Sequence, residues 1–293
     1  MKFSVSSYSY QQYINQGKMT QLDVVQKAVE MGFSGIDFTD LKPVPNATLA
    51  DQLAEAKRIR LAAEQAGVEV VAYTIGAKLY QGSREADEAE IERICRQLDV
   101  AAEMGATILR HDVCKSERIE GKTIGFTQML PVIAENAARV TEYAKTLGIR
   151  TCSENHGYVA QDSDRVEALW NAVGHENYGL LIDVGNFACV DEDSVKAVSR
   201  LAPYAIHVHA KDFYIYPFGT AVPQGVSTFS SRGCNRLAGC VIGEGSIPVA
   251  QCLSVLRRIG YDGYVTVEYE GAEDCISGIA RGLSNLRSMT ERI

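Results

Sequence analysis

One arrangement recurs along this chain and restricts its fold more than any other feature. A stretch with apolar residues at helical spacing is followed by a glycine and then by a short run rich in β-branched and apolar residues. Glycine at such a junction suits the left-handed conformation that commonly ends a helix. The glycines and the runs that follow them are Gly32 before 35–38, Gly67 before 68–73, Gly105 before 107–109, Gly148 before 149–152 and Gly260 before 264–268.

Three further runs complete the pattern, because 3–6 opens the chain and 179–183 and 205–209 follow helical patterns at 164–173 and 194–201. With a last helix over 276–289, this predicts eight strands and eight helices. Strict alternation of strands and helices implies parallel strands joined by crossovers, and eight units in one chain of this length match a single (β/α)8 TIM barrel of α/β class over residues 1–293. An open doubly wound sheet is the alternative, but no Gly-x-Gly-x-x-Gly turn follows the first strand.

The segment from about residue 212 to 247 interrupts the alternation. It contains many glycine, serine and aromatic residues and little helical pattern. Because it follows the seventh strand, on the face where barrel enzymes carry their sites, we expect it to be a substrate-binding loop or lid.

Composition excludes several classes of function. The formal net charge of -8 disfavours a nucleic-acid backbone as partner, since phosphate contacts require clustered lysines and arginines. No apolar run approaches the roughly 20 residues of a membrane helix, and residues 1–10 lack the features of a secretory signal, so we expect a cytoplasmic protein that acts on small molecules. The eight cysteines form no Cys-x-x-Cys pair, which predicts reduced residues.

Four residues with metal-binding side chains stand at the ends of consecutive predicted strands. They are Glu154, Asp183, His209 and Glu268. The carboxyl ends of barrel strands converge, and three carboxylates in one pocket would repel one another unless a cation compensates. Three oxygen ligands and one imidazole favour one divalent ion, most simply Mn²⁺, with Co²⁺, Mg²⁺ and Zn²⁺ as alternatives.

Neighbouring residues give weaker signals for proton transfer and substrate binding. His156, two residues after Glu154, is a candidate acid or base, and Lys211 could polarise a substrate oxygen. At the end of the fourth strand either Arg110 or His111 could face the pocket, but alternation allows only one of them to do so. The remaining candidates for substrate binding are Arg232 and Arg236, which lie in the long segment and could hold an anionic group, and Asn186, which follows the sixth strand.

Several motifs together resemble the xylose isomerase-like barrel superfamily, in its sugar phosphate isomerase/epimerase branch. The motifs are Ser-Glu-Asn-His-Gly, Ile-Asp-Val-Gly-Asn, His-Val-His-Ala-Lys-Asp, Gly-Glu-Gly-Ser-Ile-Pro and Gly-Tyr-Asp-Gly-Tyr-Val-Thr-Val-Glu-Tyr-Glu-Gly. The resemblance covers most of the chain and implies that the same quartet binds a metal ion, with Glu154 and Glu268 also acting as the acid/base pair. It implies homo-oligomers as well.

The chain departs from parts of this family. Ketohexose epimerases often carry a substrate-binding histidine three residues after the sixth-strand aspartate, where this chain has Asn186. The endonuclease branch needs more histidines for three zinc ions, and this chain has five in total, so nuclease activity is not expected.

The expected function is therefore a divalent-metal-dependent isomerase or epimerase of a sugar or keto-sugar that works through a metal-stabilised enediolate. The alternative is a lyase on the same scaffold, such as a keto-inositol dehydratase or a keto-glycoside eliminase, in which His156 would serve as base. A non-catalytic sugar-binding or partner-binding barrel is a third possibility.

Overall fold

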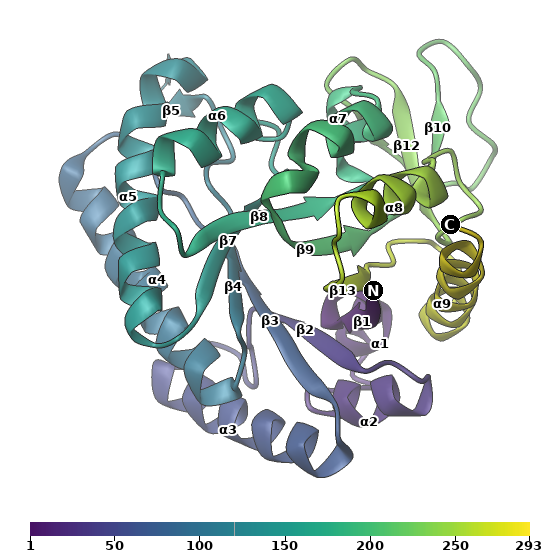
Figure 1. Ribbon diagram of the computed structural model, residues 1–293, viewed down its shortest axis with the longest axis horizontal. Helices are drawn as coiled ribbons and strands as arrows, with labels where there is room; N and C mark the ends of the chain where they lie inside the picture. Colours follow the sequence, from purple (N-terminus) through teal and green to yellow (C-terminus); the bar gives the residue numbers. More distant parts are fainter. Residues whose placement is uncertain (120) are drawn as a thin grey trace.

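Eight parallel strands form a closed barrel in the computed structural model, which describes residues 1–119 and 121–293 (Figure 1). Their order around the barrel is β1-β13-β9-β8-β7-β4-β3-β2, so the last strand closes against the first. All eight predicted strands are present, and the barrel confirms the predicted fold class. The strands are β1 (Lys2–Ser6), β2 (Gly35–Thr39), β3 (Glu69–Ile75), β4 (Ile108–His111), β7 (Arg150–Glu154), β8 (Tyr178–Asp183), β9 (Ala205–Ala210) and β13 (Tyr264–Val267).

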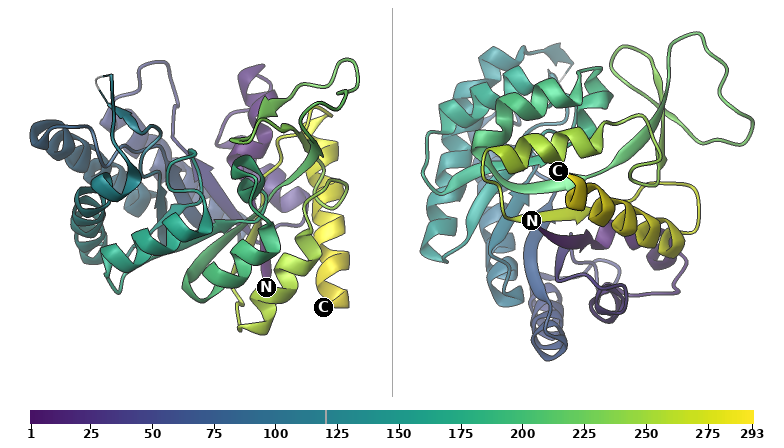
Figure 2. Two further views of the ribbon diagram at one scale, coloured as in Figure 1. Left: turned by 90° about the horizontal axis from the view of Figure 1, so that it is seen from above. Right: turned by 45° about the vertical axis from the view of Figure 1, so that its right-hand side comes forward.

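Helices surround the barrel, and the two chain termini lie near each other at one end of it (Figure 2). The helices between strands and at the carboxyl end are α2 (Asp23–Glu30), α3 (Leu49–Ala66), α4 (Arg84–Met104), α5 (Phe126–Thr146), α6 (Ser163–Val173), α7 (Ser194–Leu201), α8 (Val249–Arg258) and α9 (Cys275–Arg292). A short additional helix, α1 (Gln11–Asn15), follows a 3-10 turn at Ser7–Tyr10. Further 3-10 turns lie at Asn186–Val190 and Ala202–Tyr204.

The helix boundaries follow from local sequence. Thr48 begins α3 through a capping box, in which the Asp51 amide donates to the Thr48 hydroxyl and the Thr48 amide donates to the Asp51 carboxylate. Gly67 ends α3 with a φ of 70°, and Gly105 ends α4 with a φ of 82°. The predicted left-handed glycine caps are thus confirmed at both helices.

Side chains alternate between the barrel interior and the surrounding helices. The main apolar core lies between strands and helices, whereas a small separate cluster fills the barrel interior with Ala72, Ile108, Cys152 and Leu181. Two residues further along the strands that carry Cys152 and Leu181, the same alternation directs Glu154 and Asp183 inward as well. On β7 and β8, the inward-facing side chains therefore change from apolar to charged toward the carboxyl ends of the strands.

The long segment after β9 is more ordered than a loop. It contains a three-stranded antiparallel sheet of β10 (Asp212–Tyr216), β11 (Phe229–Ser230) and β12 (Arg236–Cys240), which stands beside the barrel near α8 (Figure 1). The Asp212 carboxylate closes this excursion, because it accepts hydrogen bonds from the amides of Gly243 at 2.9 Å, Gly245 at 3.0 Å and Ile247 at 3.0 Å. One buried side chain thus joins both ends of the segment. A second small sheet pairs β5 (Arg118–Ile119) with β6 (Lys122–Thr123).

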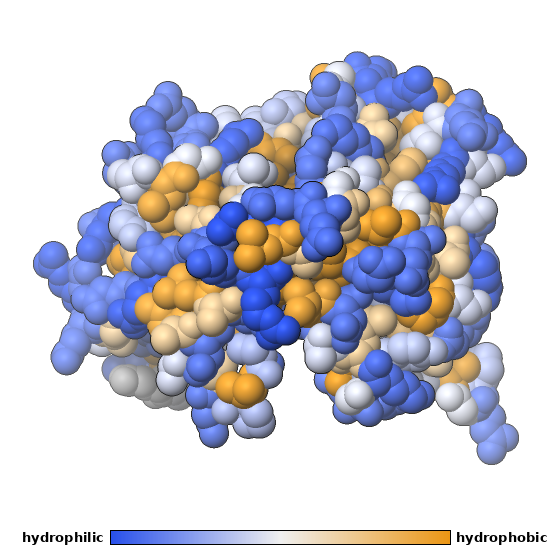
Figure 3. Space-filling view, turned by 90° about the horizontal axis from the view of Figure 1, so that it is seen from below, coloured by the Kyte–Doolittle hydropathy of each residue, from blue (hydrophilic) through white to orange (hydrophobic). Residues whose placement is uncertain are grey.

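Hydrophilic residues cover much of the face seen in Figure 3, and apolar residues lie between them in patches. Among the described helices, none combines the length and apolar character needed to cross a membrane. All eight cysteines are free, as expected from their spacing.

Candidate metal centre and substrate cavity

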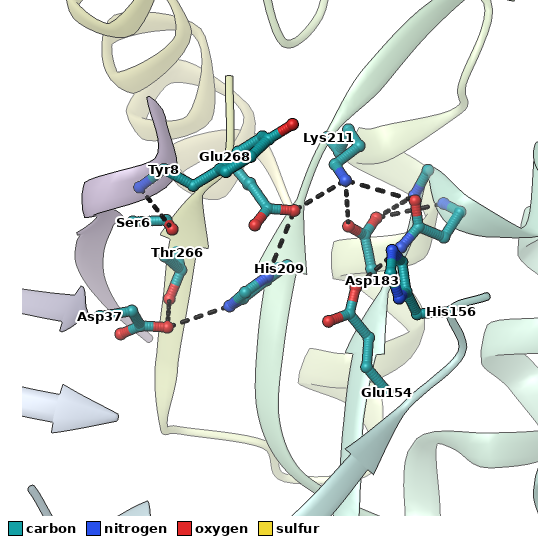
Figure 4. Close-up of polar contacts among 12 residues, drawn as sticks. Ser6, Tyr8, Asp37, Glu154, His156, Asp183, His209, Lys211, Thr266 and Glu268 are labelled. Carbon is teal, nitrogen blue, oxygen red and sulfur yellow. Dashed lines mark hydrogen bonds and ion pairs between the residues drawn. The ribbon is translucent and has the colours of Figure 1, made fainter. Parts of the chain in front are cut away.

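Four side chains from consecutive barrel strands meet at the carboxyl end of the barrel. Glu154 ends β7, Asp183 ends β8, His209 lies on β9 and Glu268 follows β13 by one residue. Each offers one ligand atom, and these atoms all lie within 4.8 Å of one another (Figure 4). The structure therefore brings together the four residues that the strand ends predicted.

Neighbouring side chains and backbone amides hold the two carboxylates on β7 and β8 in place. Glu154 accepts from the Asn186 side-chain amide at 2.7 Å, and its second oxygen lies 2.7 Å from the Arg110 guanidinium. Asp183 uses Oδ1 to accept the backbone amides of Gly185 at 2.8 Å and Asn186 at 3.1 Å. Burial raises the pKa of Asp183 to about 7, although the Lys211 ammonium acts in the opposite direction.

Lys211 places a positive charge among three acids at this end of the barrel. Its Nζ lies 2.7 Å from Glu268, 3.4 Å from Asp183 and 3.5 Å from Glu270. Burial by itself would raise the pKa of Glu268, but Lys211 and His209 together hold that pKa well below its usual value. Glu268 is therefore ionised under neutral conditions.

Asp37 on β2 orients the histidine of the quartet. Its Oδ2 accepts from His209 Nε2 at 3.0 Å, His207 Nε2 at 2.6 Å and the Thr266 hydroxyl at 3.0 Å. Burial opposes ionisation of Asp37, yet the two imidazoles lower its pKa to about 2. Because Nε2 of His209 donates to a carboxylate, Nδ1 is the atom directed toward the quartet, as in the carboxylate–histidine pairs of metal sites.

The donor set fits a divalent ion on observations within the structure itself. Among the described residues, Asp183 Oδ2 and His209 Nδ1 are buried atoms without a hydrogen-bond partner, and both belong to the quartet. Buried polar atoms are nearly always satisfied, so these two partnerless atoms within a cluster of three carboxylates and one imidazole fit a bound divalent cation. Glu154, Asp183, His209 and Glu268 could hold it.

A second buried network links Glu154 to His156. Arg110 lies between two acids, 2.7 Å from Glu154 and 2.9 Å from Asp112, and the Asp112 carboxylate lies 2.8 Å from Nδ1 of His156. Burial opposes ionisation of Asp112, but Arg110 and His156 hold its pKa well below the usual range. With Nδ1 engaged by Asp112, Nε2 of His156 is the nitrogen left for proton exchange.

Of the two candidates at the end of the fourth strand, Arg110 is turned toward the acids and His111 away from them, so His111 is not placed to bind substrate. Arg110 occupies that side of β4, and alternation turns His111 outward, where it is fully buried near the Tyr178 ring at a centroid distance of 6.3 Å. Its Nδ1 contacts the Asp112 carbonyl at 2.8 Å. His111 therefore lies between barrel and helices instead of beside the acids.

A cavity of about 920 Å³ opens above the quartet. Lys211, Asn186 and His156 line it, and the first two contact the quartet carboxylates, so the acids lie directly below the cavity floor. Neither of the two arginines of the long segment is among the described lining residues. Arg232 pairs with Asp162 at 2.5 Å, and Arg236 donates to Thr228 and Ser230 within its own sheet.

Comparison with known families now identifies the chain. The family model described as xylose isomerase-like TIM barrel matches residues 25–289. The chain belongs to this family. That membership agrees with the closed barrel and with the motifs at the ends of its strands.

Individual relatives of this xylose isomerase-like barrel are distant. The rhizopine catabolism protein MocC of Rhizobium meliloti is 27% identical over 229 residues, which cover 70% of this chain and 63% of MocC, so the match spans less than two thirds of that relative. A crystal structure of the IolI protein with a bound zinc atom has a TM-score of 0.75 at 14% identity and covers 100% of this chain and 99% of its own. D-psicose 3-epimerase, solved in the presence of D-fructose, has a TM-score of 0.70 at 17% identity and covers 98% of both chains.

Sequence reasoning missed two residues of the site in this xylose isomerase-like chain. Asp37 lies in the buried run Gly-Ile-Asp-Phe-Thr, and a lone carboxylate among buried strand residues is the signal that could have revealed it. Asp112 directly follows the fourth strand. Its contact with His156, which lies 44 positions later and after another strand, is visible only in the fold.

Proposed function

We propose that this protein is a divalent-metal-dependent isomerase or epimerase of a sugar or keto-sugar. The observation that carries the proposal is the quartet below the cavity floor, with Glu154 and Glu268 at its two flanks. The barrel order β13-β9-β8-β7 places His209 and Asp183 between the two glutamates. A substrate above the quartet would therefore have one carboxylate on either side.

The first proposed role is metal binding. Glu154, Asp183, His209 and Glu268 would hold the ion, for which Mn²⁺ is our first choice and Co²⁺, Mg²⁺ and Zn²⁺ are alternatives. When bound, a divalent ion polarises a substrate carbonyl and so acidifies the neighbouring C–H group. The zinc in the IolI structure supports a divalent ion in this fold.

Proton transfer falls to the two glutamates. The Lys211 ammonium, 2.7 Å from Glu268, favours the ionised carboxylate, and Glu268 would accept a proton from the substrate carbon. For epimerisation, Glu154, fixed by Asn186 and Arg110, would enter the cycle protonated and give its proton to the opposite face of the same carbon, while Glu268 keeps the proton that it removed. For isomerisation, Glu268 would return its proton to the adjacent carbon. Asn186 and Lys211 line the cavity and would position substrate oxygens.

A lyase is the second candidate, and the His156–Asp112 pair favours it. An elimination needs an additional acid or base near the leaving group, and His156 lines the cavity with Nδ1 fixed 2.8 Å from Asp112. The proton abstraction would be common to both reactions, and only the fate of the carbanion would differ.

Incubation with keto-sugars in deuterated water tests the proposal and separates the two candidates. We expect deuterium at the carbon next to the carbonyl with an intact carbon skeleton, detected by NMR, and loss of this exchange in Glu268→Gln. Release of water or of an aglycone would establish the lyase instead. A protein that binds sugars but exchanges no proton would be a non-catalytic barrel.

We also propose an oligomeric state and a location in the cell. Homo-oligomers are expected from the family resemblance and can be measured by light scattering of the purified protein. The location that we propose is cytoplasmic, and it can be checked by fractionation of cells that produce the protein.

A further inference from the structure

We propose that the outer part of the cavity is a subsite for an aromatic substituent, so that the substrate is an uncharged keto-sugar joined to an aromatic aglycone. This inference rests on the proposed function, because the keto-sugar part is assigned to the space above the quartet. The observations that carry it are the size of the cavity, the chemistry of its walls and the distribution of charge around it.

The cavity is larger than one sugar ring requires. Its volume of about 920 Å³ lies near the upper end of the roughly 300–1,000 Å³ typical of pockets for drug-sized ligands. Polar and charged groups that could bind sugar hydroxyls gather near the quartet, where Lys211, Asn186 and His156 lie. A single ring bound there would leave the outer part of the cavity without a ligand.

Aromatic side chains from separate elements form that outer part. Tyr214 comes from β10 and Phe229 from β11, and each lines the cavity while 37–40% of its surface stays exposed, whereas Tyr8 lines the cavity beside Glu268 (Figure 4). Phe213 supports Phe229 from below in an edge-to-face contact at a centroid distance of 5.5 Å. Half-exposed aromatic faces around one opening are suited to stack on another ring, which would remove them from water.

Charge around the cavity argues against a phosphorylated substrate. Two lysines are among the described lining residues, and both are paired with acids, Lys211 with Glu268 at 2.7 Å and Lys115 with Asp112 at 3.2 Å. Glu270 and Glu273 also line the cavity. A phosphate group would meet these carboxylates without a described arginine among the lining residues to neutralise it.

Binding of non-reacting glucosides tests the subsite without requiring turnover. The probes are phenyl β-D-glucopyranoside, methyl β-D-glucopyranoside and glucose 6-phosphate, with dissociation constants measured by titration NMR. We expect the phenyl glucoside to bind about 5- to 10-fold more tightly than the methyl glucoside, and glucose 6-phosphate to bind more weakly than either. Equal affinities for the two glucosides, or tightest binding of the phosphate, would overturn the proposal.

Matched variants locate the effect. Phe229→Ala and Tyr214→Ala should each remove most of the preference for the phenyl glucoside, whereas Phe218→Ala should leave it unchanged. Phe218 belongs to the same segment and is 78% exposed, but it does not line the cavity. Circular dichroism verifies that each variant is folded, and an unchanged preference in folded Phe229→Ala and Tyr214→Ala would contradict the assignment.

The proposed function and the subsite can fail separately. If the phenyl preference is found but no keto-sugar exchanges a proton, the catalytic proposal fails and the aromatic subsite stands. If proton exchange occurs and Phe229→Ala lowers kcat/KM equally for a bare keto-sugar and for its phenyl glycoside, the catalytic proposal stands and the subsite fails.

Discussion

Asp37 shows how a residue outside the quartet controls a ligand within it. Its single oxygen Oδ2 accepts hydrogen bonds from two histidines and one threonine, and it thereby fixes the ring of His209. Loss of such a partner typically weakens metal binding about 10- to 100-fold. The carboxylate is thus predicted to matter for the ion even though it lies below the ligands.

The corresponding prediction concerns Asp37→Asn. We expect the affinity for Mn²⁺, measured by isothermal titration calorimetry, to fall about 10- to 100-fold because His209 loses its charged acceptor. Asp23→Asn, which changes an exposed acid at the start of α2, is the control and should bind Mn²⁺ normally. An unchanged affinity in Asp37→Asn would show that His209 does not need this partner.

A substitution of His156 distinguishes the isomerase or epimerase from the lyase. If the glutamates carry out both proton transfers, His156→Asn should retain deuterium exchange within about tenfold, whereas Glu268→Gln should lower it by more than about 100-fold. The comparison is made by NMR on the same keto-sugar. An equally large loss in His156→Asn would mean that the histidine is itself the base, as expected for an eliminase.

The site residues were predictable to the extent that they end strands. Glu154, Asp183 and His209 follow recognisable strand runs, so convergence in a barrel was enough to group them. Asp37 was not predictable in this way, because its role arises from a hydrogen bond across the barrel to residues 170 and 172 positions later. The direction of Arg110 and His111 depended on which side of β4 each occupies, and the sequence left that open.

At the scale of elements, glycine caps and apolar periodicity were sufficient to predict the barrel. Each helix carries its own signals, such as the Thr48 capping box and the left-handed Gly67 at the two ends of α3. The sheet in residues 212–247 had no comparable signal, because β11 has only two residues and the Asp212 carboxylate that closes the segment binds amides far along the chain. A side chain that accepts amides more than 30 positions away cannot be recognised from spacing.

Asp212 gives the prediction for this element. In Asp212→Ala, the amides of Gly243, Gly245 and Ile247 lose their acceptor, so we expect the free energy of unfolding to fall by about 1–3 kcal/mol and the segment to be cleaved faster by protease. Urea denaturation and limited proteolysis measure these effects. Asp262→Ala, at an exposed turn before β13, should change neither.

For the whole molecule, the charged barrel end predicts how ion binding depends on pH. Burial raises the pKa of Asp183 to about 7, and the carboxylates around His209 overcome its burial and raise its pKa well above the usual value. A bound ion requires the ionised acid and the neutral imidazole. Protons must therefore leave when the ion binds.

The affinity for the ion is expected to rise with pH. Below pH 7 both Asp183 and His209 carry the proton that the ion displaces, so about two protons are released and affinity rises steeply with pH. Above pH 7 Asp183 is already ionised, and about one proton is released. Calorimetry at pH 6 and pH 8 in buffers of different ionisation enthalpy measures these numbers, and the absence of proton release at pH 6 would contradict the predicted state of the site.

We propose that the quartet of Glu154, Asp183, His209 and Glu268 holds an ion on which proton transfer depends. The most direct measurement titrates metal-free protein with Mn²⁺ in deuterated water and follows bound ion and deuterium incorporation into a keto-sugar in the same sample. We expect both to rise together and to level off at one ion per chain, and neither to do so in Asp183→Asn. Full deuterium incorporation in the metal-free protein would contradict it.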